Sequence, residues 1–284
     1  MADDSPHFAG RTLVIATKHA KEQVIAPILE ADLGLHCVTP DGLDTDLLGT
    51  FTGEIERVLN PLDAAREKCK RAMDLVGCDL AVASEGSFGP HPNMPFVPGN
   101  EEMLVLVDRH HGLELVVREV SADTNFDSTS LASQSELLGF AEKVGFPDHG
   151  LILRRSRDSD EAIHKGIREE QDLLDVFQLL NDQFGDVLVE TDMRAMHNPT
   201  RMSVIEAATH KLVELARAVC PECGAPGFSV AEVVRGLPCA ACGLPTNSAS
   251  RYISVCKACA FSQEQRFPQG KEAEDPMYCE FCNP

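Results

Sequence analysis

Four Cys-x-x-Cys pairs in the last quarter of the chain constrain its fold more than any other feature of the sequence. The pairs are Cys220 with Cys223, Cys239 with Cys242, Cys256 with Cys259, and Cys279 with Cys282. Two residues between cysteines let both thiolates reach one metal ion, and two such pairs complete a closed tetrahedral site with Zn–S distances of about 2.3 Å. The spacing therefore predicts a small module that binds two structural zinc ions.

The spacing leaves open which pairs share an ion. The second and third pairs flank the strand-like segment 251–255, as in a zinc ribbon, and this pairing would leave the outer pairs to share the second ion. Sequential pairing, first with second and third with fourth, is the alternative. Gly224 and Gly243 directly follow two of the pairs, where the tight turn of a zinc knuckle is expected. In either arrangement the metal would supply folding free energy that so small a core lacks.

The length and the N-terminal residues bound the class of protein. A chain of 284 residues, 43% of them hydrophobic, suffices for one large domain and a small appendage. Residues 1–11 lack a secretory signal, and no apolar run approaches the roughly 20 residues that span a bilayer. We therefore expect a cytoplasmic protein without a membrane partner, in which cysteines bind metal or stay free. Cys37, Cys69 and Cys78 are expected to be small buried hydrophobes.

The charge of the chain limits its partners. The formal net charge is −20, and no basic face is visible in the sequence, which argues against binding to long nucleic acid. A nucleotide or another small phosphorylated ligand remains compatible, because a few cations and a divalent metal ion can outweigh the net charge locally. A protein partner of the zinc module and a homodimer also remain open.

Apolar runs that alternate with helical patterns predict an α/β domain over residues 1–217, followed by a zinc-ribbon domain over residues 218–284. The expected strands are 13–16, 79–83, 103–107, 113–117, 151–153 and 186–190. Asn60 and Pro61 predict the start of a helix that ends near Val76. A helical stretch is expected after residue 157, up to about Leu180. Ser203 and Glu206 form a capping box that predicts the start of the last helix, which stops at Cys220.

A glycine- and proline-rich segment follows the second predicted strand. We expect residues 84–92 to end that strand, and residues 86–99 to form a semi-rigid loop that covers a site near Glu85. Polar residues also follow the other predicted strands: Thr17–Lys21, Arg154 and Asp192. Open α/β sheets bind ligands at the carboxyl ends of their strands, so this edge is the candidate site.

Three segments resemble the inosine/xanthosine triphosphate pyrophosphatase superfamily, whose members hydrolyse abnormal purine nucleoside triphosphates. Residues 15–21 (IATKHAK) are similar to the family's strand that ends in Thr-Asn-x-x-Lys and holds the triphosphate. Thr17 and Lys21 match that motif, whereas Lys18 replaces its asparagine. The helix from Leu62, with the strand 80–86 that follows it, resembles the family's helix and its strand ending in an acidic residue and a glycine near the metal.

The third segment is 194–201 (RAMHNPTR), which looks like the family's loop over the base and phosphates, with His197 and Arg201 as the matches. The resemblance covers residues 11–217 and implies a mixed sheet flanked by helices. It also implies Mg²⁺-dependent hydrolysis between the α- and β-phosphates of a nucleotide. The zinc tail is not part of the usual enzyme, and the whole layout also resembles a bacterial family without an assigned function.

The residue chemistry suits such a reaction. Thr17, Lys18 and Lys21 would hold phosphates at a helix start. Glu85 would bind Mg²⁺, with help from Asp192 or Glu190. Positive charge for the transition state would come from Arg201 and from Arg154 or Arg155, and His197 would contact the ligand.

An adaptor that senses nucleotides without hydrolysing them is the alternative. Three departures from the family pattern favour it: Lys18 in place of asparagine, Glu85 as the one clear carboxylate, and the extended segment 86–99.

Overall fold

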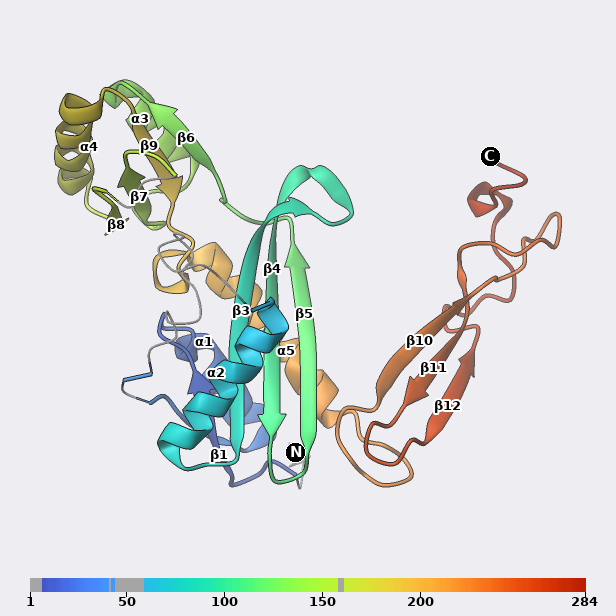
Figure 1. Ribbon diagram of the computed structural model, residues 1–284. Coiled ribbons are helices and arrows are strands. Elements are labelled where there is room, and N and C mark those ends of the chain that lie inside the picture. The colour runs from blue at the N-terminus through green and yellow to red at the C-terminus, as the bar shows by residue number, and fades with distance from the viewer. Residues whose placement is uncertain (1–6, 41, 44–58, 158–160) are drawn as a thin grey trace. The chain divides into compact units, whose positions relative to one another are not determined.

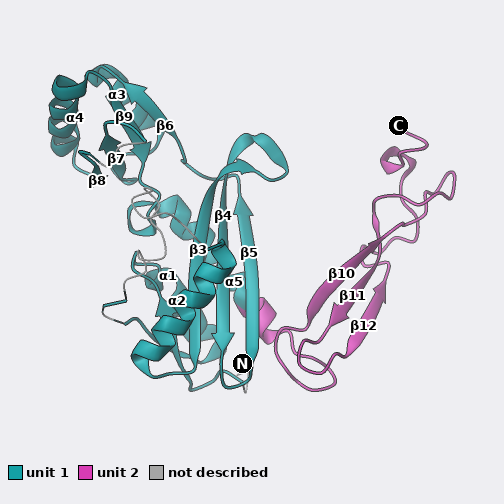
Figure 2. Cartoon of the chain, viewed as in Figure 1, with its two compact units in different colours: residues 1–212 teal, residues 213–284 magenta. Residues whose placement is uncertain are grey.

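The structure is a computed structural model that describes residues 7–40, 42–43, 59–157 and 161–284. The chain divides into two compact units, residues 1–212 and residues 213–284 (Figure 2). The division falls inside one long helix, α5 (Pro199–Arg217). None of the helices in the described part of the chain is long and apolar enough to cross a membrane.

The first unit is built on a mixed five-stranded sheet with the strand order β2-β1-β3-β4-β5. Its strands are β1 (Thr12–Ala16), β2 (His36–Val38), β3 (Leu80–His91), β4 (Met94–Asp108) and β5 (Leu113–Ser121). β1 runs parallel to β2 and β3, whereas β3, β4 and β5 run antiparallel to one another. Helix α1 (Glu22–Leu33) connects β1 to β2. The prediction of an α/β domain with a mixed sheet flanked by helices is therefore confirmed.

Helix α2 (Pro61–Val76) begins as the sequence predicts. Oδ1 of Asn60 accepts a hydrogen bond from the Asp63 amide at 3.0 Å, and Pro61 occupies the first helical turn. α2 lies on one face of the five-stranded sheet and α5 on the opposite face (Figure 1). The buried stripe of α2 packs against β1, β3 and β4, and it consists of Ala65, Cys69, Ala72 and Met73.

The prediction of a loop after the second predicted strand is wrong. β3 continues through the glycine- and proline-rich segment to His91 and pairs with β4, so residues 86–99 form a two-stranded arm and not a loop over Glu85. The arm tolerates proline because β1 stops pairing with β3 at Ala83 and β5 stops pairing with β4 at Asn100. In the described part of the chain, neither outer edge of the arm pairs with a further strand. A proline there, which has no N–H group to donate, therefore loses no hydrogen bond to a neighbouring strand.

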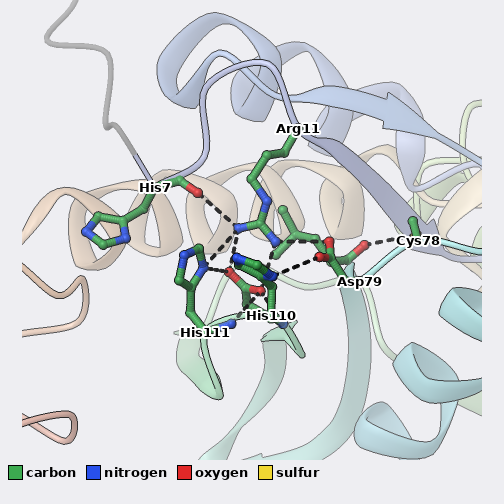
Figure 3. A network of polar contacts seen from close by, with 8 residues as sticks. His7, Arg11, Cys78, Asp79, His110 and His111 are labelled. Carbon is green, nitrogen blue, oxygen red and sulfur yellow. Dashed lines mark hydrogen bonds and ion pairs between the residues drawn. The ribbon is translucent and has the colours of Figure 1, made fainter.

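An ion-pair network lies at the amino end of β1 (Figure 3). The Arg11 guanidinium donates to both carboxylate oxygens of Asp108, at 2.5 and 2.8 Å, and to Asp79 at 3.0 Å. The Asp108 carboxylate also accepts the amides of His110 and His111, which lie in the turn between β4 and β5 as predicted. Burial alone would raise the pKa of Asp108, but these hydrogen bonds lower it to about 2.

The first unit also contains an antiparallel four-stranded sheet with the order β6-β9-β7-β8. Its elements are β6 (Ser128–Leu131), α3 (Gln134–Lys143), β7 (Leu151–Arg154), β8 (His164–Ile167), α4 (Glu170–Phe184) and β9 (Val187–Thr191). The helices α3 and α4 share one hydrophobic core with β7 and β9. The predicted helical stretch after residue 157 was too long, because β8 occupies its first part and α4 begins only at Glu170.

Helix α5 begins four residues before the predicted capping box. Oδ1 of Asn198 accepts the Arg201 amide at 2.9 Å, and Pro199 is the first helical residue. Ser203 lies inside the helix, where its hydroxyl donates to the Pro199 carbonyl at 3.3 Å. The Asn-Pro start that marks α2 therefore marks α5 as well, and the capping-box prediction is wrong.

The second unit contains an antiparallel three-stranded sheet with the order β10-β11-β12. The strands are β10 (Ser229–Arg235), β11 (Ala249–Val255) and β12 (Ser262–Arg266). The predicted strand 251–255 is thus part of β11. Few side chains of this sheet are buried, and the buried residues of the unit include four of its cysteines.

Candidate functional site

A group of charged side chains is buried beyond the carboxyl end of β1, where the chain turns into α1. Lys21 is only 6% exposed, and its Nζ donates to the carbonyl oxygen of Ser84 at 3.0 Å and to its Oγ at 3.1 Å. Ala20, the residue before it, has a φ of 59°, a left-handed conformation that is costly for a non-glycine residue. The turn of the backbone at Ala20 thus precedes a lysine that points into the sheet.

Ser84 links Lys21 to a fully buried ion pair. The Ser84 hydroxyl donates to Oε2 of Glu102 at 3.2 Å, and Oε1 of Glu102 accepts from Nε of Arg201 at 2.7 Å. Glu102 and Arg201 are both 0% exposed. Nη1 of Arg201 also donates to the Met193 carbonyl in the segment after β9. The chain of contacts therefore joins β3 and β4 to α5 and to the second sheet.

Gly86 makes room for this ion pair. A Cβ atom placed on Gly86 would lie 2.3 Å from both Nη2 of Arg201 and Oε1 of Glu102. Any larger residue would push one of these charged groups away from β3. The glycine in the Ser-Glu-Gly run is therefore needed for packing of the pair, whatever its role in ligand binding.

Glu85 and Lys68 form a second pair that sequence reasoning missed. The Lys68 ammonium on α2 contacts Oε1 of Glu85 on β3, and their side chains are 14% and 8% exposed. Lys68 is thus partly buried, whereas Arg66 and Lys70 on the same helix are exposed. Its position directly before the buried Cys69 is the one signal in the sequence that it borders the core.

The cluster carries a surplus of positive charge in a strongly acidic chain. Lys21, Lys68 and Arg201 offer three cations, against the two carboxylates of Glu85 and Glu102. Burial, with a smaller contribution from the nearby Arg201, lowers the pKa of Lys21 to about 7, although the two carboxylates act in the opposite direction. An anion would favour the charged form of this lysine.

The other predicted site residues lie around this cluster in separate contacts. The buried Asp192 carboxylate accepts hydrogen bonds from the Arg194 guanidinium, from Nε at 3.0 Å and from Nη2 at 2.6 Å, and from the Arg194 amide at 3.0 Å. Arg154 on β7 pairs with Glu190 on β9 at 2.7 Å. Burial lowers the pKa of His197, and its Nδ1 is buried without a hydrogen-bond partner among the described residues. The carboxylates of Asp192 and Glu190 thus each have an arginine partner.

Two clefts flank the turn between β1 and α1. One of about 420 Å³ is lined by Thr17, the exposed Lys18 and the segment after β2. The other, of about 470 Å³, is lined by α1 and α5 residues together with Asp148, Arg168 and Met196. Ala20 lines both clefts. A small ligand could therefore reach this turn from either side.

The eight cysteines of the second unit form two groups of four. Cys220 and Cys223 lie with Cys256 and Cys259, and Cys239 and Cys242 lie with Cys279 and Cys282. The first pair thus joins the third, and the second joins the fourth. Both pairings that the spacing suggested are wrong, because each CxxC turn determines only its own two ligands and the β-sheet determines which turns meet.

The sulfur positions fit zinc. The Sγ–Sγ separations between cysteines of different CxxC pairs are 3.7 Å in the first group, and 3.9 and 3.7 Å in the second. A tetrahedron with Zn–S distances of 2.3 Å has edges of about 3.8 Å. Backbone amides lower the pKa of Cys239 and of Cys256 to about 7, whereas the neighbouring cysteines raise the pKa of Cys259 and of Cys282 to about 12. The two groups could therefore hold two zinc ions.

The knuckle turns repeat the same backbone geometry. The amide of Gly224 donates to the Cys220 carbonyl at 2.8 Å, and Gly243 repeats this contact with Cys239 at 2.9 Å. Gly224 has a φ of 72°, which glycine adopts without strain. The prediction of tight turns at these two glycines is confirmed.

Comparison with known proteins gives one family. The model of a family described as "Domain of unknown function (DUF6671)" matches residues 68–284. The matched region contains Lys68, Glu85, Glu102, Arg201 and all four cysteine pairs, whereas Lys21 precedes it. No curated protein matches the chain.

Proposed function

The chain belongs to the family described as a domain of unknown function (DUF6671), and we propose that its first unit is a Mg²⁺-dependent nucleoside triphosphate pyrophosphohydrolase. The observation that carries the proposal is the buried cluster in which Lys21, Lys68 and Arg201 meet Glu85 and Glu102. Cations and carboxylates in one buried cluster suit a phosphate chain and a divalent metal ion together.

The phosphate chain would lie at the turn into α1. Lys21 is the N-cap of α1, and helix starts attract anions through their free amides and the helix dipole. The cluster has one positive charge more than its carboxylates balance when Lys21 is protonated. The exposed Lys18 and the adjoining cleft would give access from solvent. Lys21 would thus hold phosphate, with Lys68 beside the metal ligand.

Glu85 is the residue that would hold Mg²⁺. This ion is typically bound by one or two carboxylates together with substrate phosphates and water, so one strand-borne carboxylate suffices. Glu85 is buried and has Lys68 as its charge partner, which supports an anionic carboxylate in this position. When bound, the ion would neutralise phosphate charge and activate water. Lys68 would then be free to pair with phosphate.

Kinship with the inosine/xanthosine triphosphate pyrophosphatases is part of the proposal. It is supported by the mixed sheet flanked by helices and by the order of Thr17, Lys21, Glu85 and Arg201 along the chain. Base recognition would fall to the segment with His197, whose Nδ1 is buried without a partner in the described structure. The zinc groups would be structural, because four cysteines close each site.

A second candidate function is nucleotide sensing without hydrolysis. One specific observation favours it: the carboxylates Glu102, Asp192 and Glu190 are each paired with an arginine, and Glu85, the remaining candidate metal ligand, is itself paired with Lys68. A protein that bound nucleotide and Mg²⁺ but released no product would fit this arrangement.

A pyrophosphate-release assay against common and deaminated nucleoside triphosphates tests the proposal. We expect Mg²⁺-dependent release from one class of nucleotide, and loss of turnover in Glu85→Gln, which keeps the shape but loses the anionic ligand. Lys21→Ala should weaken nucleotide binding because a phosphate loses its partner.

Lys68 and Lys70 offer a matched control on α2. Lys68 contacts Glu85, whereas Lys70 is exposed on the same helix. Lys68→Ala should lower kcat/KM by roughly tenfold or more, the cost of about 1.4 kcal/mol of transition-state stabilisation. Lys70→Ala should leave it unchanged. Equal activity of both variants, or nucleotide binding without any turnover in the parent, would reject the enzyme; the latter result would favour the sensor.

A further inference from the structure

Glu274 is the one buried charged side chain of the second unit, every residue of which the structure describes. Its side chain is 3% exposed. A buried carboxylate costs free energy unless it is both paired and hydrogen-bonded. Glu274 lies on the C-terminal segment (residues 267–284), which also contains the fourth cysteine pair. The contacts that offset the cost of its burial hold this segment in place.

The carboxylate of Glu274 ties the C-terminal segment to the sheet. The Lys271 ammonium donates to Oε1 at 2.6 Å and to Oε2 at 2.7 Å. The Asp275 amide donates to Oε1 at 2.9 Å, and the Ser248 hydroxyl donates to Oε2. Ser248 directly precedes β11, so this last contact joins the C-terminal segment to the central strand of the three-stranded sheet.

The main chain of Glu274 contacts the second cysteine turn. Its amide donates to the Pro238 carbonyl at 2.8 Å, and its carbonyl accepts the Ala240 amide at 2.9 Å. These two hydrogen bonds form a parallel bridge between Glu274 and Cys239. Glu274 therefore lies beside one cysteine of the second four-cysteine group, on the segment that leads to Cys279 and Cys282 of the same group.

The first four-cysteine group is assembled by strand pairing. Its first turn, which contains Cys220, precedes β10, and its second turn begins at Cys256, directly after β11. Ser229 at the start of β10 pairs with Val255 at the end of β11, which brings the two turns to the same end of the sheet. The hydrogen bonds of the sheet therefore hold this group together.

The second four-cysteine group depends on the C-terminal segment as well. The turn that contains Cys239 lies in the connection between β10 and β11. The turn that contains Cys279 comes later, because residues 267–278, which the structure describes throughout, form no strand between β12 and this cysteine. Strand pairing thus places only one of the two turns, and the contacts of Glu274 bring the other turn to it.

We propose that Glu274 is the positioning residue of the second zinc site: its buried carboxylate docks the C-terminal segment so that the fourth cysteine pair meets the second. The affinity of a metal site depends on the groups that orient its ligands as well as on the ligands themselves. The second site therefore depends on this carboxylate, whereas the first site, which the sheet assembles, does not. The inference concerns the second unit and does not depend on hydrolysis by the first.

Removal of zinc from the zinc-loaded full chain by a competing chelator tests the proposal. We expect the Glu274→Ala variant to bind one of its two ions about tenfold or more weakly than the parent, the usual effect of losing a group that orients metal ligands. The other ion should bind as it does in the parent. Equal affinities of parent and variant for both ions, equal weakening of both ions, or a parent that holds no zinc would overturn the proposal.

Further variants separate positioning from general stability. Cys279→Ser disables the second group, so adding Glu274→Ala to it should not change the affinity for the remaining ion. Glu274→Gln keeps the shape and a hydrogen-bond acceptor, and it should bind the second ion more tightly than Glu274→Ala does. Glu272→Ala is the matched control, because Glu272 is exposed on the same segment, and it should bind both ions as the parent does. If adding Glu274→Ala weakens the ion that remains in Cys279→Ser, the carboxylate stabilises the whole unit and the positioning role is rejected.

Discussion

Oε1 of Glu102 lies 2.7 Å from Nε of Arg201, across 99 residues of sequence, and neither side chain is exposed to solvent. The pair joins β4 to the start of α5, and of its two members only Arg201 was a predicted site residue. Removing one member of a buried pair leaves an uncompensated charge, whereas replacing both by apolar residues is often tolerated.

The first prediction follows from this pair. Glu102→Leu should lower the free energy of unfolding of the first unit by about 3–5 kcal/mol, and adding Arg201→Met should restore much of that loss. Unfolding in urea followed by far-UV circular dichroism measures it, since the helices lie mostly in the first unit. Glu114→Leu, which breaks the exposed pair with Arg66, should cost about 1 kcal/mol or less. A double variant with a lower free energy of unfolding than the Glu102→Leu variant would contradict the account.

Gly86 and Gly89 provide a second test on one strand. A Cβ at Gly86 would collide with both charged groups of the buried pair, whereas a Cβ at Gly89 meets no atom within 4 Å. Gly86→Ala should therefore destabilise the first unit by about 1–3 kcal/mol through overpacking. Gly89→Ala should change stability much less. Equal unfolding midpoints of the two variants would show that the pair has room to move.

The pKa of Lys21 predicts how stability depends on pH. Its pKa is about 7 in the folded chain and 10.5 when unperturbed, so between these values the unfolded chain binds more protons. The free energy of unfolding should then rise with pH in this window, by up to about 1.4 kcal/mol per pH unit for this group. Lys21→Met should lack that slope. Parallel pH profiles of parent and Lys21→Met between pH 7.5 and 9.5 would contradict burial of the lysine.

The interleaved pairing of the cysteines predicts zinc stoichiometry. Cys220 and Cys256 belong to one group, whereas Cys239 belongs to the other. Replacing Cys220 and Cys256 together by serine should remove one zinc ion and leave the second. Replacing Cys220 and Cys239 should impair both sites. Metal analysis of the purified variants separates these outcomes, and loss of a single ion from the Cys220 and Cys239 double variant would support sequential pairing.

Local signals in the sequence predicted local structure well. The Asn60-Pro61 start of α2 was read correctly, because capping involves neighbouring residues only. The same signal at Asn198-Pro199 was overlooked in favour of the capping box at Ser203, although the helix uses the earlier start. The CxxC turns also depend on neighbouring residues only, and they were predicted correctly. Their pairing, in contrast, depends on how β10, β11 and β12 bring the turns together.

Contacts between distant segments could not be predicted in this way. The sequence shows prolines at 90, 92, 95 and 98, which argue against a strand in isolation. They are tolerated because both outer edges of the arm are unpaired in the described structure. The Lys68–Glu85 and Glu102–Arg201 pairs likewise arise only when α2 and α5 pack on the sheet. Lys21 and Glu85 were identified as candidate site residues, but their buried partners were not.

The products of the reaction test the central claim most directly. The full chain is incubated with Mg²⁺ and a deaminated purine nucleoside triphosphate, and the phosphorus products are followed by ³¹P NMR. The account predicts nucleoside monophosphate and inorganic pyrophosphate in equal amounts, with no product after Glu85→Gln. Release of inorganic phosphate with nucleoside diphosphate, or an unchanged spectrum at saturating nucleotide, would contradict it.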